Sequence, residues 1–165
     1  MIFVTIGTQL PFDRLICALD KWAASNPEEE IFAQIGQSTH EPQHMRWART
    51  ISSNAFNSIL QECSTVVAHA GMGTIISAVE CGKRVVVLPR LAEFGEHRND
   101  HQLATADRLS HLNGLVVAND VEDLTRAMNV GRDTDRLLNR VSSPPLTVSP
   151  ELINEIRLFS GLQLA

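Results

Sequence analysis

The sequence is poor in cysteine, has no excess of basic residues and contains no long apolar run. Its three cysteines show no CxxC spacing and stand among apolar neighbours, which excludes a disulfide framework and favours small core residues in a reducing compartment. A net charge of -5 leaves no basic stripe for nucleic acid. No apolar run approaches the roughly 20 residues that span a bilayer, and no basic segment precedes the short apolar start. We therefore expect a cytoplasmic protein.

The apolar pattern alternates between short strands and amphipathic helices. A chain of 165 residues is enough for one domain and too short for two. Strands are predicted at 2–6, 31–35, 65–68, 85–88 and 115–117, and helices at 11–23, 56–63, 72–81, 99–109 and 121–129. This alternation predicts an α/β fold with a Rossmann-like parallel sheet flanked by helices.

The remaining segments are predicted from their polar or proline-containing composition. The polar stretch 37–46 is expected to be a loop, in which His40 and His44 have no assigned role. Residues 131–148, with Pro144 and Pro145, are expected to be a connector. A final helix starting near Ser149 would carry one apolar face, which either closes the domain's own sheet or docks on a partner. The predicted division is thus a domain over 1–130 and an appendage over 131–165.

The strand at 65–68 breaks into a glycine loop that opens a helix. Gly71 and Gly73 would let backbone N–H groups approach a ligand closely, and the helix start adds partial positive charge. A glycine loop that opens a helix in this way commonly binds phosphate, and the Thr74 hydroxyl could donate a further hydrogen bond. The alternative is that the glycines only make a tight turn.

A second polar cluster follows the next strand. The strand 85–88 ends at Pro89 and leads to the polar run 95–102. Because loops that leave the carboxyl ends of neighbouring parallel strands meet at one edge of the sheet, the two clusters are expected to converge. A phosphate-binding loop beside polar groups that bind hydroxyls is the arrangement that a nucleotide-sugar ligand would need.

These residues resemble a known family. The segments His69–Thr74, Gly95–His97 and Asp100–Gln102, with Glu80, Gly82 and Pro89, resemble the C-terminal domain of glycosyltransferase family 28. The opening Phe3–Thr8, with Phe12 and Asp13, is similar to the start of short stand-alone members of that family. Those members are soluble subunits of two-chain transferases: bacterial capsule and exopolysaccharide subunits, and the soluble subunit of the transferase that adds N-acetylglucosamine to a dolichol-linked sugar. The resemblance covers about residues 1–130.

The resemblance implies a single donor-binding half of a GT-B fold. It further implies an inverting, UDP-sugar-dependent hexosyltransferase that extends a polyprenyl-diphosphate-linked sugar acceptor in exopolysaccharide or capsule synthesis. A membrane-anchored acceptor-binding subunit would be the partner and would supply the catalytic base. The chain would then be peripheral at the inner face of the membrane. No cofactor and no metal is implied, since the UDP-sugar is a substrate.

The resemblance also assigns roles to individual residues. Backbone and hydroxyl groups after two strands would hold the diphosphate, and Gln102 with Asp100 or His101 would bind sugar hydroxyls. Many relatives carry a ribose-binding glutamate where this chain has Ser77, so Glu80, one turn further along the helix, is the preferred candidate and Ser77 the alternative. The full set of expected donor-binding residues is Gly7, Thr8, His69, Gly71, Met72, Gly73, Thr74, Glu80, Glu96, His97, Asp100, His101 and Gln102.

Competing interpretations exist for several of these features. His69 could be a structural histidine at the end of a buried strand, and Glu96 a solvated loop charge. His97 and His101 have the spacing of a metal pair but no third ligand nearby. The chain could be a non-catalytic, nucleotide-binding regulatory subunit. A dinucleotide-dependent oxidoreductase is disfavoured, because no GxGxxG motif follows the first strand.

Overall fold

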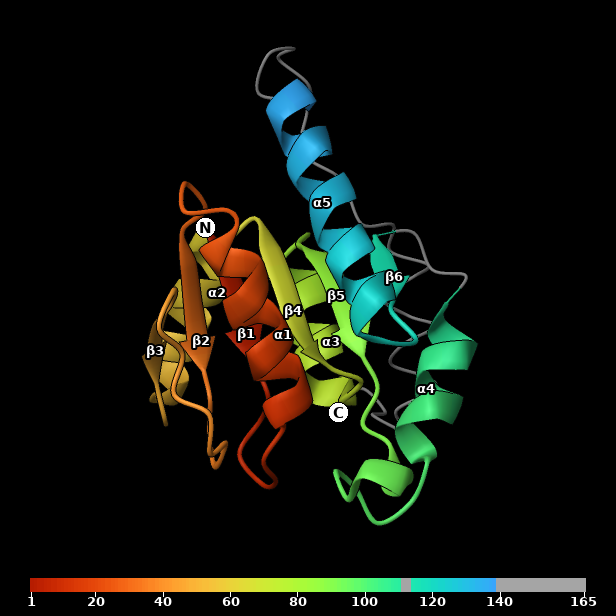
Figure 1. Cartoon of the computed structure of the whole chain (residues 1–165). Coiled ribbons are helices and arrows are strands. Elements are labelled where there is room, and N and C mark those ends of the chain that lie inside the picture. The colour runs from red at the N-terminus through yellow and green to blue at the C-terminus, as the bar shows by residue number, and fades with distance from the viewer. Residues whose placement is uncertain (111–113, 139–165) are drawn as a thin grey trace.

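The computed structural model describes residues 1–110 and 114–138 (Figure 1). They form a six-stranded, wholly parallel sheet in the order β3-β2-β1-β4-β5-β6. The strands are β1 (Ile2–Thr5), β2 (Ile31–Gln34), β3 (Arg46–Ala48), β4 (Thr65–His69), β5 (Arg84–Leu88) and β6 (Leu115–Val117). The helices are α1 (Asp13–Ala24), α2 (Ser53–Glu62), α3 (Met72–Glu80), the 3-10 turn η1 (Ala92–Phe94), α4 (His101–Leu109) and α5 (Val121–Leu138).

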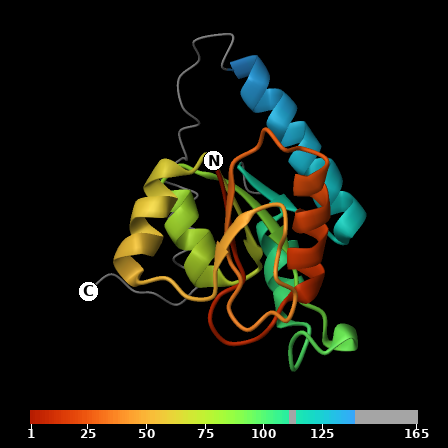
Figure 2. The ribbon, with the colours of Figure 1, turned by 60° about the vertical axis from the view of Figure 1, so that its left-hand side comes forward.

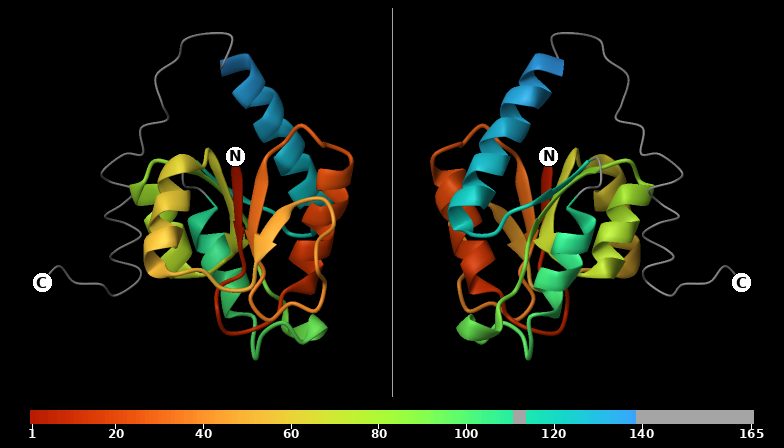
Figure 3. Two further views of the ribbon diagram at one scale, coloured as in Figure 1. Left: turned by 90° about the vertical axis from the view of Figure 1, so that its left-hand side faces the viewer. Right: turned by 90° about the vertical axis from the view of Figure 1, so that its right-hand side faces the viewer.

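Helices cover both faces of the sheet (Figures 2 and 3). Helices α1 and α5 lie on one face, and α2, α3 and α4 lie on the other. The central strands β1, β4 and β5 are therefore buried on both sides, which explains their continuous apolar sequences. None of the helices in residues 1–110 and 114–138 combines the length and the apolarity that crossing a bilayer requires.

Two segments differ from the sequence prediction. The predicted loop 37–46 ends in an edge strand, β3, whose three residues are too few to show a strand pattern. Helix α5 runs to Leu138, so residues 131–138 are helical, not the start of a connector. Gly131 lies inside this helix, and a Cβ on it would meet the guanidinium of Arg84. The predicted final helix and the prolines at 144 and 145 lie outside the described residues, and the domain division stays a prediction.

Smaller differences concern where elements begin and end. Helices α1 and α4 begin two residues later than predicted, at Asp13 and His101, and α2 begins three residues earlier, at Ser53. The Ser52 hydroxyl caps α2 by accepting the backbone N–H of Ala55 at 3.2 Å. The three cysteines are free; Cys63 is buried, whereas Cys17 and Cys81 are only partly covered.

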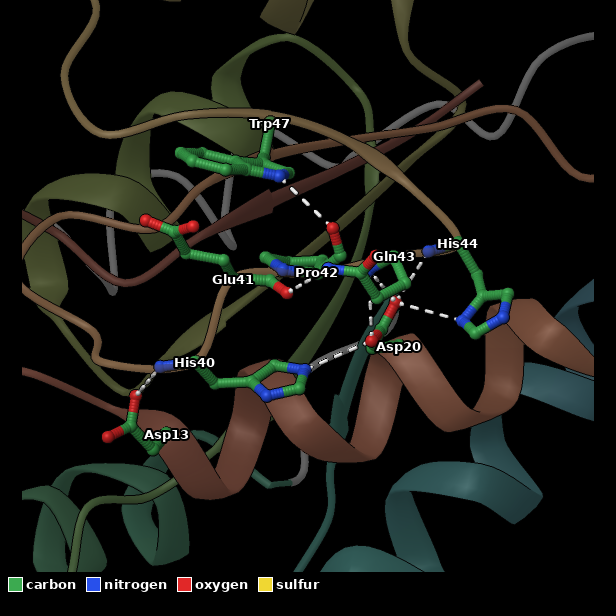
Figure 4. Close-up of polar contacts among 8 residues, drawn as sticks. All are labelled: Asp13, Asp20, His40, Glu41, Pro42, Gln43, His44 and Trp47. Carbon is green, nitrogen blue, oxygen red and sulfur yellow. Dashed lines mark hydrogen bonds and ion pairs between the residues drawn. The ribbon is translucent and has the colours of Figure 1, made fainter.

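The polar loop after β2 is fastened to α1 by a buried carboxylate (Figure 4). Asp20 is 6% exposed and accepts backbone N–H groups from Gln43 at 3.0 Å and His44 at 2.8 Å. Its oxygens also lie 3.0 Å from His40 Nε2 and 3.4 Å from His44 Nδ1. One and a half to two turns earlier on the helix, Asp13 accepts from the backbone N–H of Thr39 and of His40. His40 and His44 thus have a structural role that the sequence did not indicate.

This loop in turn supports the turn between β1 and α1. The Ser38 hydroxyl accepts the backbone N–H of Phe12 at 3.2 Å. Gly36, at φ +49°, lies so close to the Gly7 carbonyl oxygen that a Cβ would sit 3.0 Å from it. The carboxylate on α1 therefore helps to position a loop at the carboxyl edge of the sheet.

We expect Asp20→Asn to lower the free energy of unfolding by about 1–3 kcal/mol at pH 7, because the amide weakens a buried acceptor with several donors. Burial would raise the pKa of Asp20, but donors from His44, His40 and Gln43 outweigh it and hold that pKa below its ordinary value. The carboxylate's contribution is therefore present at neutral pH and lost as the pH falls through the lowered pKa.

Urea unfolding of wild type and variant at pH 7 and in acid measures this difference. Asp107→Asn, an exposed change on α4, is the matched control. A variant as stable as the wild type at pH 7 would show that the carboxylate is dispensable.

Candidate functional site

Strands β1, β4 and β5 end at the lower edge of the sheet in Figure 1. The loops that follow these strands line a hollow of about 370 Å³. Parallel pairing brings three loops to this place, from 6–10, 69–74 and 90–102. The hollow is lined by Ile6, Gly7, Thr8, Gln9, Leu10, His69, Gly71, Gly73, Thr74, Arg90, His97 and Gln102. Thr74 and Gln102, from the two clusters expected to converge, share this hollow.

The His69 ring fills the space between two glycines of the hollow. Gly7 adopts φ +74°, and a Cβ on it would lie 3.0 Å from His69 Cε1. A Cβ on Gly71 would overlap His69 Nε2. These two glycines are therefore required by the packing of the histidine, in addition to any role toward a ligand.

His69 is held in its neutral form. Burial, and then the positive charge of Arg90, lower the pKa of His69 to about 4. A neutral imidazole at the wall of the hollow can exchange hydrogen bonds with a ligand but brings no charge at physiological pH.

The N-terminus of α3 opens onto the hollow. Gly71 is the N-cap and has no side chain to satisfy the first N–H groups of the helix, so these donors and the positive end of the helix face the ligand edge. A Cβ on Gly73 would meet nothing within 4 Å, which means that this glycine borders open space. Thr74 adds its hydroxyl in the same turn.

Gln102 contributes an oriented amide. Its side chain is 9% exposed, and its Oε1 accepts the backbone N–H of Arg90 at 3.0 Å. Because that partner is a donor, the amide oxygen is fixed there and the NH₂ group is left as a donor for a ligand.

The sequence analysis missed two arginines. Arg90 lines the hollow and is buried, and Arg14 forms a bidentate ion pair with Glu96, with both contacts at 2.8 Å. The Leu91 N–H also donates to Glu96 at 2.9 Å. Glu96 therefore holds the loop after β5 against α1. Arg90 could have been found from the sequence, because it follows Pro89 directly at the carboxyl end of a predicted strand.

Five of the expected residues do not line the hollow: Met72, Glu80, Glu96, Asp100 and His101. Glu80 is exposed at the last position of α3, about 12 Å along the axis from the first. Asp100 accepts the backbone N–H of Ala92 at 3.0 Å, and His101 is exposed. Ser77 is also absent from the lining, so the ribose-binding residue stays a prediction. Across the described parts of the chain, no three His, Cys, Asp or Glu residues gather into a metal site.

We expect Gly71→Ala to destabilise the protein by about 1–3 kcal/mol, because the added methyl overlaps a packed imidazole. The matched change Gly73→Ala adds the same methyl to the same helix turn in open space, and should leave stability unchanged or raise it by up to about 1 kcal/mol. Thermal unfolding of both variants decides this, and equal melting temperatures would contradict the packing role of Gly71.

We expect His69 to make the protein sensitive to mild acid. The unfolded chain binds a proton at His69 below about pH 6.5, whereas the folded chain resists protonation down to about pH 4, so stability is lost between these values by about 3 kcal/mol. Replacing His69 with Gln should flatten this dependence in urea unfolding at pH 7 and pH 5, and His101→Gln should not. Equal pH dependence of the wild type and the His69 variant would refute the buried neutral state.

The fold is similar to that of solved glycosyltransferases. Among solved structures, the chain is similar to MurG of Acinetobacter baumannii (TM-score 0.57, 21% identity, 94% of this chain and 44% of that one). It is also similar to Os79 of O. sativa, solved in complex with U2F and trichothecene (TM-score 0.64, 14% identity, 94% of this chain and 36% of that one). The predicted fold class, one Rossmann-like half of a GT-B fold, is confirmed.

Sequence comparison identifies the family. A curated relative is the UDP-N-acetylglucosamine--N-acetylmuramyl-(pentapeptide) pyrophosphoryl-undecaprenol N-acetylglucosamine transferase of Prochlorococcus marinus (strain MIT 9312), 27% identical over 89 residues. The match covers 52% of this chain and 23% of that relative, so the matched segment is less than a quarter of the longer protein. The family model for the glycosyltransferase family 28 C-terminal domain matches residues 1–135, and the chain belongs to this family.

Proposed function

We propose that the chain is the donor-binding part of an inverting UDP-sugar hexosyltransferase. It would extend a polyprenyl-diphosphate-linked sugar in exopolysaccharide or capsule synthesis, at the inner face of the membrane. A membrane-anchored acceptor-binding subunit would complete the active site and supply the catalytic base. The proposal needs no metal, because oriented N–H donors can stabilise a departing diphosphate.

The hollow at the carboxyl edge of the sheet is the observation that carries this proposal. It combines the N-terminus of α3, the hydroxyls of Thr8 and Thr74 and the oriented amide of Gln102. Backbone donors and a positive helix end suit phosphate oxygens, whereas an amide NH₂ suits a sugar hydroxyl. Two further hollows lie elsewhere: one is lined by Trp22 and Asn129 of α1 and α5, and the other by Ile2, Thr65 and Arg84 at the amino ends of β1, β4 and β5.

The names of the curated relatives support the donor class and the acceptor class of the proposal. The curated relatives are named for a UDP-N-acetylglucosamine donor and a pyrophosphoryl-undecaprenol acceptor. The chain covers 23% and 17% of their lengths, which leaves acceptor binding to a further chain or segment. Phe94, 59% exposed near the ligand edge, is a candidate contact for that missing part.

We expect UDP to bind the isolated chain and raise its melting temperature, and NAD and NADP to leave it unchanged. Gly73→Ala should weaken UDP binding roughly tenfold or more, since its methyl enters the hollow without disturbing the fold. Calorimetric titration measures both affinities. Failure of the wild-type chain to bind UDP would overturn the proposal.

Sugar transfer requires a second test. Co-expression with the acceptor-binding subunit, a UDP-sugar panel and a polyprenyl-diphosphate-linked acceptor should give transfer that neither chain gives alone. UDP binding without transfer by the pair would indicate the regulatory subunit instead.

A further inference from the structure

Arg90 ties the walls of the hollow together. It stands two residues beyond the end of β5 and is 3% exposed. Its Nη2 donates to the carbonyl oxygens of Ile6 and Leu10, both at 2.8 Å, and its Nη1 donates to the carbonyl oxygen of Glu96 at 3.3 Å. All these acceptors are backbone groups, so they orient the guanidinium without neutralising it.

No ion pair joins Arg90 to a carboxylate in residues 1–110 and 114–132, and its buried Nε has no hydrogen-bond partner there. The carboxylate of Glu96 is turned to Arg14, which binds both of its oxygens. The ring of Phe12, 5.1 Å from the Arg90 Cζ, offers only a cation–π contact. Burial lowers the pKa of Arg90 by more than the negative charge of Glu96 raises it, yet a guanidinium stays protonated. Arg90 is therefore a buried cation without a direct ion pair, because the Glu96 carboxylate is bound to Arg14.

The lining of the hollow has no other permanent charge. The remaining described residues around it are apolar, glycine, hydroxyl, amide or histidine, and none is a carboxylate. Arg90 and the helix end of α3 therefore bring positive charge to the hollow, whereas the Glu96 carboxylate is not part of its lining and is paired with Arg14. A ligand with more than one negative charge would complement both sources, whereas a singly charged ligand complements one.

We propose that Arg90 makes this hollow selective for diphosphates over monophosphates, by supplying the buried positive charge that the second phosphate neutralises. The inference rests on the proposed nucleotide-sugar function and adds a specificity-determining residue to it. Because Arg90 is bonded to the hollow's wall through three carbonyls, it is a positioning residue as well as a source of charge. In turnover, the same charge would favour departure of the nucleoside diphosphate, whose negative charge grows as the bond to the sugar breaks.

The test compares uridine, UMP and UDP on wild type, Arg90→Gln and Arg90→Lys by calorimetric titration. Gln keeps a donor for one wall carbonyl and removes the charge, whereas Lys keeps the charge and removes the planar fork. We expect the ratio of UDP to UMP affinity to fall roughly tenfold in Arg90→Gln. Arg90→Lys should restore most of the ratio, and uridine affinity should change little in either variant. Arg98→Gln, an exposed change on the same loop, should leave the ratio unchanged.

The outcomes separate this inference from the proposed function. UDP binding to wild type with an unchanged ratio in Arg90→Gln would overturn the role of Arg90 alone. Equal losses for uridine, UMP and UDP would show a merely structural arginine and would also overturn it. If wild type binds no UDP, the proposed function fails with it.

A measurement on the wild-type chain guards against variants that do not fold. Inorganic pyrophosphate should raise the melting temperature of the wild type well above the effect of inorganic phosphate at the same concentration, because only the former presents two linked anionic groups. Equal effects of the two anions would contradict the proposal without recourse to any variant.

Discussion

The parallel register of β1, β4 and β5 is the constraint on which the site depends. Thr5 pairs with Ala68, and His69 pairs with Leu88, so the three strands end at nearly the same level. The chain then leaves each strand toward the same edge, where backbone donors, a neutral imidazole and a guanidinium meet within one hollow. A slip of one residue would turn the side chains of these buried strands to the opposite face and separate the groups.

Much of this arrangement could be predicted from the sequence, because buried parallel strands have a simple signature. The apolar runs at β1, β4 and β5 and the glycines that follow them predicted the sheet and its ligand edge. The edge strand β3 could not be found this way, since three half-exposed residues carry no pattern. Helix α5 was predicted to end at residue 129, whereas it continues through Gly131 to Leu138.

The site was harder to predict than the fold, because several of its residues act through the backbone. Arg90 and Asp20 bind carbonyl or N–H groups of loops distant in sequence, and such partners have no side-chain signature. His69 was open to a structural and a ligand-binding interpretation. The structure shows that it packs between two glycines and borders the hollow, and ligand binding by His69 stays a prediction. The sequence pointed to Glu96 as a candidate site residue. It did not predict the ion pair of Glu96 with Arg14, because the two residues are 82 positions apart in the sequence.

The His69 ring fills the space beside Gly7 and Gly71, so the size of the side chain at position 69 limits which residues fit at positions 7 and 71. A smaller residue at 69 would leave a void that a side chain at 71 could occupy, whereas position 7, with its left-handed backbone, would still demand glycine. Redesign of this wall must therefore exchange residues 69 and 71 together, and sequences that diverge at one of them should diverge at the other.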